Sequence, residues 1–75
     1  MMNPDELKIM KKIAEHELIT KIELKKFLQA GGSDAGLDSI TKSLLQKNYI
    51  TTVNMVGSTC YIITKNGAQL MKEID

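Results

Sequence analysis

The sequence has no arginine, no tryptophan, one proline and one cysteine. Because Cys60 is alone, the chain cannot form an internal disulfide, and it has too few thiols for a metal site built on cysteine. All ten basic residues are lysines. The missing arginine counts against a nucleic-acid partner, since arginine is the usual bidentate ligand of guanine edges and a frequent phosphate contact. It does not exclude such a partner, because lysines gathered on one face can supply positive potential.

Long apolar runs are also missing. No stretch approaches the roughly 18 consecutive apolar residues of a membrane-spanning helix, and residues 1–6 carry acidic side chains where a signal peptide carries basic ones. A lone cysteine fits a reducing compartment. We therefore expect a soluble cytoplasmic protein without membrane contact.

Length and composition indicate one small folded domain, residues 1–75. The chain is 43% hydrophobic and 25% charged, with a formal charge of +1, which is ordinary for a soluble globular domain. It shows no Ser-His-Asp set, phosphate-binding glycine loop or paired carboxylates suited to catalysis, and His16 has no second histidine or cysteine nearby. We predict a non-enzyme with no metal and no cofactor.

The N-terminal segment reads as a helix that starts at Asn3 and Pro4. Asn3 suits the N-cap, Pro4 the first helical position, and Glu6 completes a capping box. One face is apolar and predicted to pack inward, with Leu18 beyond it as a plug. Its members are Leu7, Met10, Ile13 and Ala14. Ile9 falls between the two faces, which indicates either a broad core stripe or a partner contact.

A second helix of about ten residues follows over 20–30. Thr20 is its expected N-cap, with Glu23 as capping-box partner. Gly31 is expected to end it in the left-handed conformation. The inward residues are Leu24, Phe27 and Leu28.

A third helix is predicted over 33–47, capped by Ser33 or Asp34 and with Gly36 in its first turn. Its apolar stripe, at i, i+3, i+4, i+7 and i+8, comprises Leu37, Ile40, Thr41, Leu44 and Leu45. Its opposite face is small and polar and comprises Ala35, Asp38, Ser39, Lys42, Ser43 and Gln46. That face is open to a partner surface.

A hairpin over 49–64 is indicated by two runs rich in β-branched residues, 49–55 and 59–64, around a turn at 56–58. It contains no charged residue. Thr64 then caps a last helix, which packs back on the domain or against a second copy. The apolar positions of this helix are Leu70, Met71 and Ile74.

Two short motifs flank the hairpin. Residues 44–50 read Leu-Leu-Gln-Lys-Asn-Tyr-Ile, similar to Leu-x-x-x-Gly-x-Ile with Asn48 in the glycine slot, a mild exchange because asparagine tolerates positive φ. Residues 61–67 read Tyr-Ile-Ile-Thr-Lys-Asn-Gly, similar to Tyr-x-Leu-Thr-x-x-Gly. With this order of elements, nearly the whole chain resembles the winged helix-turn-helix DNA-binding domains of MarR-like and PadR-like regulators. The expected fold is α+β, with three helices, a two-stranded wing and a C-terminal helix.

The resemblance implies a small transcriptional regulator that binds double-stranded DNA. Residues 20–30 become the positioning helix, 33–47 the major-groove recognition helix and 49–64 the wing. The implied base-reading residues are Ser39, Lys42, Ser43 and Gln46. The implied backbone contacts are Lys21, Lys25, Lys26, Ser58 and Thr59. A homodimer on two half-sites is the natural arrangement, with Ile9 and the apolar side of 70–74 as candidate dimer surfaces.

Several departures from the family favour an alternative. Asp34 and Asp38 lie near the end that should approach phosphates, Lys25 stands where a small residue is usual, and the hairpin is neutral. The alternative is a protein–protein interaction module of a larger complex that does not contact DNA directly.

Overall fold

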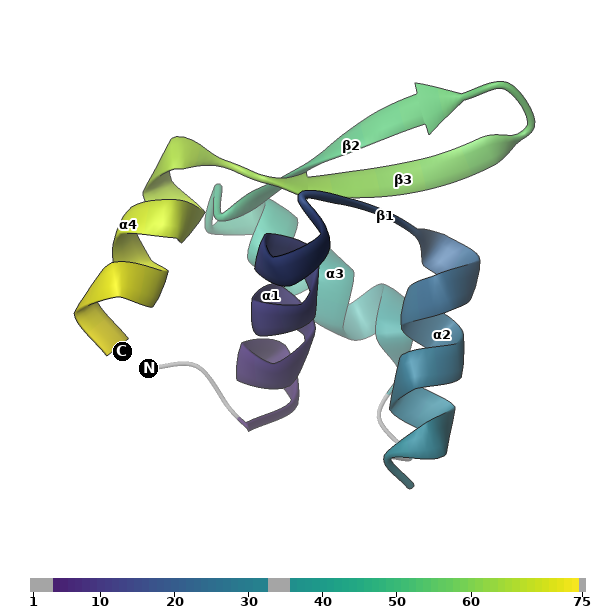
Figure 1. The fold of residues 1–75 in the computed structure, drawn as a ribbon, viewed down its shortest axis with the longest axis horizontal. Coiled ribbons are helices and arrows are strands. Elements are labelled where there is room, and N and C mark those ends of the chain that lie inside the picture. Colours follow the sequence, from purple (N-terminus) through teal and green to yellow (C-terminus); the bar gives the residue numbers. More distant parts are fainter. Residues whose placement is uncertain (1–3, 33–35, 75) are drawn as a thin grey trace.

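The computed structural model describes residues 4–32 and 36–74. It is an α+β fold in which helices pack beneath an antiparallel sheet (Figure 1). The elements in order are α1 (Pro4–His16), β1 (Leu18–Thr20), α2 (Lys21–Ala30), α3 (Leu37–Gln46), β2 (Ile50–Met55), β3 (Ser58–Ile63) and α4 (Lys65–Ile74). None of the helices in the described ranges is long and apolar enough to cross a membrane.

The sheet has three strands in the order β1-β3-β2, so the central strand is β3. Strands β2 and β3 form the expected hairpin, joined by the two residues Val56 and Gly57. Gly57 has a φ of +72°. Strand β1 was not expected, and Leu18, predicted as a buried plug, lies in it with 42% of its surface exposed. A strand of three residues is too short to show a period-two pattern, and its partner lies about forty positions along the chain.

The core lies between the helices and the sheet, and α1 runs through its centre. Helix α1 contacts α2, α3, α4, β1 and β3. For this reason its buried stripe is broad, and Ile9 is 0% exposed. Ile9 therefore belongs to the core and the prediction that it serves a dimer surface is wrong. Met71 of α4 is buried in the same cluster, so α4 packs back on the domain.

Local signals set most helix ends. Pro4 begins α1, while its expected cap Asn3 lies outside the described residues. Thr20 caps α2 as predicted, because its Oγ1 accepts the Glu23 N–H at 3.1 Å. The end of α2 differs from the prediction. Gly31 is right-handed at φ −80°, and Gly32 takes the left-handed conformation at φ +74°.

Helix α3 begins later than predicted. Gly36 is its N-cap, with φ −73° and ψ 125°, so this glycine is not inside the first turn. The predicted caps Ser33 and Asp34 lie outside the described residues. Four members of the predicted stripe are buried, but Leu45 is 37% exposed. Leu45 comes eight positions after Leu37 and is therefore rotated from it by roughly 80° about the helix axis. This rotation places Leu45 beyond the edge of the core.

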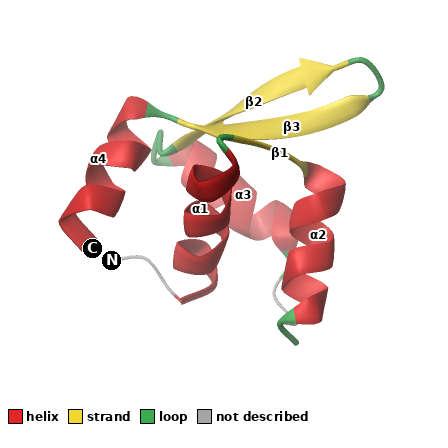
Figure 2. Ribbon diagram, in the orientation of Figure 1, coloured by secondary structure: helices red, strands yellow, loops and turns green. Residues whose placement is uncertain are grey.

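The two motifs around the hairpin meet in space. Asn48 has a φ of 63°, as expected of a residue in a glycine slot. The Thr64 hydroxyl donates to the Asn48 carbonyl at 2.7 Å and accepts the Gly67 N–H at 3.1 Å. The Thr64 N–H donates to the Tyr49 carbonyl at 3.0 Å. Together these bonds fasten the end of α3 to the start of α4 and fix where the hairpin leaves the core (Figure 2).

Candidate nucleic-acid interface

The outward face of α3 brings together three of the four predicted base-reading residues. Ser39, Lys42 and Gln46 are exposed, and their spacing of three and four residues places them on one side of the helix. Leu45, which the sequence assigned to the core, joins this face. We call the face formed by Ser39, Lys42, Leu45 and Gln46 the α3 face. It presents one ammonium, one amide, one hydroxyl and one apolar side chain, and the exposed carboxylate of Asp38 lies between Lys42 and Leu45 around the helix axis.

Ser43, the fourth predicted base-reading residue, is less accessible than the other three. It is half-buried, and its hydroxyl donates to Glu6 Oε2 at 2.8 Å. The same oxygen lies 3.0 Å from Lys47 Nζ. Glu6 is only 6% exposed, so its carboxylate is held inside the protein by groups from α3. The sequence indicated Glu6 as a cap of α1, and no local signal linked it to residues about forty positions away.

Lys21 and Asp38 form an ion pair between the start of α2 and the first turn of α3. Lys21 Nζ lies 2.8 Å from Asp38 Oδ1. This hydrogen bond, and then the attraction between the two charges, raises the pKa of Lys21 and lowers the pKa of Asp38. The proximity of Lys25 lowers the pKa of Asp38 further. The predicted phosphate contact Lys21 is thus partly neutralised by the residue that opposes phosphate binding.

The lysines of α2 lie on two sides of the helix. Lys21 and Lys25, four residues apart, share the side near Asp38. Lys25 is exposed and acts electrostatically on Asp38, towards α3. Lys26 is exposed and lies roughly 100° further round α2 than Lys25, at the edge of the side that borders α1. The three lysines predicted to neutralise a DNA backbone therefore do not form one cluster, because Lys26 is turned away from Lys21 and Lys25 by roughly 100° or more.

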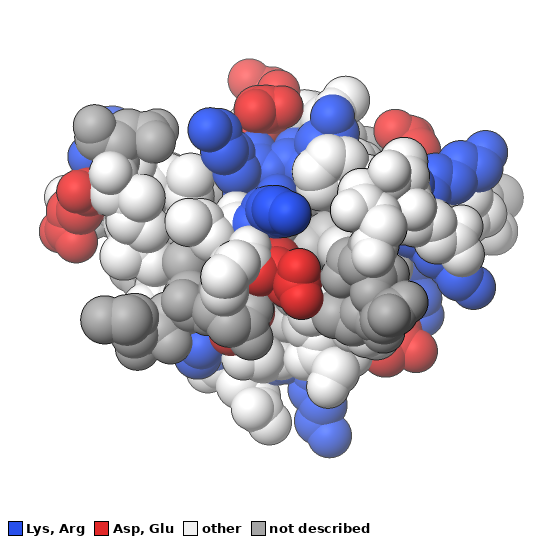
Figure 3. All heavy atoms as spheres, turned by 90° about the horizontal axis from the view of Figure 1, so that it is seen from below, with Lys and Arg blue, Asp and Glu red and all other residues white. Residues whose placement is uncertain are grey.

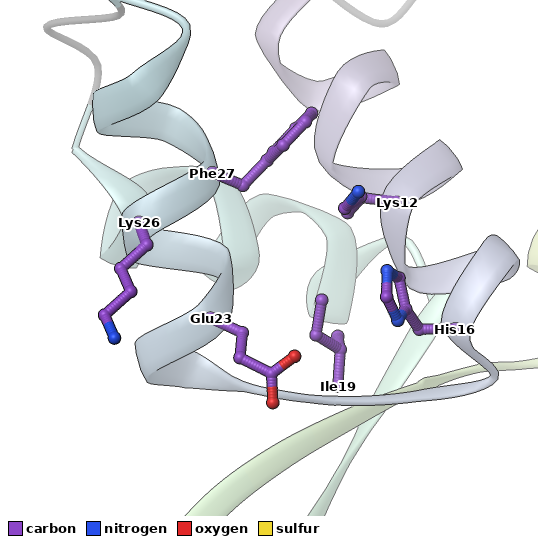
Figure 4. Close-up of a pocket in the computed structure, with 6 residues that line it drawn as sticks. All are labelled: Lys12, His16, Ile19, Glu23, Lys26 and Phe27. Atoms are coloured by element: carbon purple, nitrogen blue, oxygen red, sulfur yellow. The ribbon is translucent and has the colours of Figure 1, made fainter.

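A hollow of about 410 Å³ lies between α1 and α2 (Figure 4). Its lining residues are Lys12, His16, Ile19, Glu23, Lys26 and Phe27. Phe27 and Glu23 extend from α2 towards α1, while Lys26 extends away from the opening. Lys12 Nζ lies 4.9 Å from the centroid of the Phe27 ring, a cation–π contact. The hollow combines an apolar floor with charges of both signs, which suits an amphipathic peptide better than a nucleic-acid backbone.

The hairpin offers only neutral groups. Of its two predicted contacts, Ser58 is exposed and Thr59 is half-buried. At its tip Val56 is fully exposed, and Figure 1 shows the hairpin reaching well beyond the helices. Any contact it makes to phosphates is limited to hydroxyl, amide and backbone hydrogen bonds.

Charges elsewhere are mixed. On the side opposite the sheet, lysines and carboxylates alternate without a field of one sign (Figure 3). Within 4–32 and 36–74 no group of three histidine, cysteine, aspartate or glutamate side chains is placed to hold a metal ion. Comparisons with protein families, with curated proteins and with solved structures find no match for this chain.

Proposed function

We propose that the chain is a winged-helix DNA-binding domain that acts as a small cytoplasmic transcriptional regulator. The order of three helices, a hairpin and a trailing helix supports this proposal. The observation that carries it is the α3 face, whose polar side chains remain exposed while the opposite stripe of α3 is buried. A helix presented in this way fits the major groove of B-form DNA.

Each residue of the α3 face has a matching base chemistry. Lys42 donates to the O6 and N7 acceptors of guanine, and Gln46 pairs with the N6 and N7 groups of adenine. Ser39 donates to either acceptor, and Leu45 contacts the methyl group of thymine. Ser43 ranks below these residues, because Glu6 already holds its hydroxyl.

Backbone contacts come from Lys25, from the hydroxyls of Ser58 and Thr59, and from Lys21 once Asp38 releases it. Lys26 contributes only where the duplex reaches round α2. With so few unpaired lysines near α3, one copy neutralises few phosphates and binds weakly. A homodimer that engages two half-sites supplies the missing affinity.

The proposal is tested by titrating a mixed-sequence DNA duplex at low salt into the protein and following backbone amide NMR signals. We expect shifts on residues 37–46 and on the hairpin, fading as salt rises. On the duplex that binds most tightly among a set of sequences, Lys42→Ala should weaken affinity by roughly 1–3 kcal/mol, the worth of a specific base contact. Lys72→Ala, which removes the same charge from exposed α4, is the matched control and should change affinity much less.

Two results would contradict DNA binding by α3. One is an unshifted spectrum at high DNA concentration. The other is an equal loss of affinity in Lys42→Ala and Lys72→Ala, which would indicate attraction by overall charge alone.

The second candidate is a protein–protein interaction module. The specific observation in its favour is the hollow between α1 and α2, together with the pairing of Lys21 to Asp38. If the chain is such a module, adding the protein partner shifts the backbone amide NMR signals of the chain and adding DNA does not. Shifts would then centre on Lys12, His16 and Phe27 and would leave the α3 face unchanged.

A further inference from the structure

The sheet has one face that no helix covers. In an antiparallel sheet, side chains directly opposite each other lie on the same face and alternate along each strand. The register pairs Leu18 with Ile62 and Ile62 with Thr51, and pairs Cys60 with both Thr20 and Val53. We call the face that carries these residues the outer sheet face. Its members are Leu18, Thr20, Thr51, Val53, Met55, Ser58, Cys60 and Ile62.

The alternate residues point to the helices. Ile19, Ile50 and Tyr61 are buried members of the main core, and Ile63 packs against it. Cys60 differs, because it is 2% exposed yet is not part of that cluster. It is shielded within the sheet, where Thr20 and Val53 flank it on the two neighbouring strands. The outer sheet face is therefore separate from the core.

This face is open at its margins. Leu18 is 42% exposed and Met55 is 52% exposed. Val53 and Ile62 are half-buried, and Thr51 is exposed. All four helices of the described ranges lie on the other side of the sheet (Figure 2).

The outer sheet face carries no charge, although a quarter of the residues in the chain are charged. Five of its members have apolar or thiol side chains, and the other three are Thr20, Thr51 and Ser58. Covering such a face desolvates no ionised group. The hydroxyls can bond across a contact or to their own backbone.

We infer that two copies of the chain pack through their outer sheet faces about a two-fold axis. In such a contact each face meets itself, so a charge near the two-fold axis would lie close to its own copy. The neutral outer sheet face avoids this repulsion, whereas the side shown in Figure 3 is studded with lysines and carboxylates. Two twisted sheets packed face to face, at about 10 Å and about 30°, are a common arrangement.

The size of the face sets the strength of the dimer. Strands β2 and β3 have six residues each and β1 has three, so at about 3.3 Å per residue and about 4.8 Å between strands the face covers about 240 Å². Stable interfaces bury about 800 Å² on each partner, so the dimer is weak and forms only at high concentration. This contact leaves the α3 face uncovered but covers Ser58, which then cannot contact DNA. The inference does not depend on the proposed function.

The test compares two neighbouring threonines of β2. Thr51 and Thr52 are both exposed, but Thr51 lies opposite Ile62 on the outer sheet face and Thr52 lies opposite Tyr61 on the other face. The wild-type protein, Thr51→Lys and Thr52→Lys are studied by sedimentation equilibrium over a range of concentrations. Amide NMR spectra on dilution map the contact, and circular dichroism confirms that each variant is folded.

We expect wild type to dimerise and Thr51→Lys to raise the dissociation constant at least about tenfold. Thr52→Lys should leave it unchanged. Should Thr51→Lys fail to fold, Met55→Lys at the end of the same strand provides the same comparison. A wild type that remains monomeric at about 1 mM overturns the inference, as does an equal effect of Thr51→Lys and Thr52→Lys. A dimer lost on Ile74→Lys but kept in Thr51→Lys places the contact on α4 and also overturns it.

Discussion

Gly67 is the position at which the chain tolerates a side chain least. A Cβ atom there would clash with the Tyr49 carbonyl oxygen and would lie 2.8 Å from Ile63 Cγ1. The Tyr49 carbonyl is held in place, because it accepts a hydrogen bond from the Thr64 N–H. The glycine of the Thr-x-x-Gly motif is therefore required by close backbone approach, and its φ is not in the left-handed region.

Gly67→Ala is expected to lower the free energy of unfolding by about 3 kcal/mol, the upper range for forcing an extra methyl into a packed site. Gly36→Ala is the control, because a Cβ at Gly36 meets nothing within 4 Å. Urea denaturation of the two variants measures the difference. Equal stabilities would show that the backbone around Tyr49 gives way.

The Lys21–Asp38 pair makes a pH-dependent contribution. Since the pKa of Asp38 is lowered in the folded protein, its share of stability is present above the ordinary aspartate pKa. That share is lost as the pH falls through the lowered value. The pKa of Lys21 is raised in the folded protein. The contribution of Lys21 to stability is therefore lost at alkaline pH, as the pH rises through the raised pKa.

We expect the NMR titration midpoint of the Asp38 carboxyl carbon to lie below that of an unperturbed aspartate. Lys21→Met should raise this midpoint, and Lys72→Met should leave it unchanged. High salt should also raise it, because the pair is exposed and screened. A midpoint that does not respond to Lys21→Met would show that the ion pair is not formed in solution.

At the scale of elements, Glu6 connects α1 to α3. Its carboxylate is buried and accepts from Ser43 and Lys47. Glu6→Ala removes both bonds and leaves the Ser43 hydroxyl half-buried without this partner, so we expect a loss of about 2 kcal/mol in the free energy of unfolding. Glu15→Ala, on an exposed position of α1, should change stability little.

A double-mutant cycle with Ser43→Ala separates the contact from the general effect of truncation. The two losses should be less than additive. Additive losses in thermal or urea unfolding would show that Glu6 stabilises α1 by another route.

The helix ends that were predicted correctly are those that depend on neighbouring residues in the sequence. The Thr20 cap, the start at Pro4, the left-handed Asn48 and the Thr64 cap all depend on residues within a few positions of one another. Strand β1 and the Glu6 contact depend on partners far along the chain, which no period or cap reveals. The side of α2 on which each lysine lies depends on how that helix is rotated against α1 and α3.

At the scale of the whole molecule, apolar periodicity predicted the α+β class and most of the core. It could not say how wide the stripe on α1 is, because Ile9 faces inward only when helices pack on several sides of α1. Nor could it place Leu45, whose exposure depends on where the edge of the core falls. Of the predicted base-reading set, Ser39, Lys42 and Gln46 share one exposed face, and Ser43 turns towards α1.

Cys60 lies in the middle strand, β3, with Thr20 of β1 and Val53 of β2 on either side, and only 2% of the residue is exposed. Its side chain points away from the helices, so an alkylating reagent can reach it when the side chains around it move aside or when the strands part. The rate of alkylation by iodoacetamide therefore reports how often this part of the sheet becomes accessible, and the chain carries no second thiol that would react.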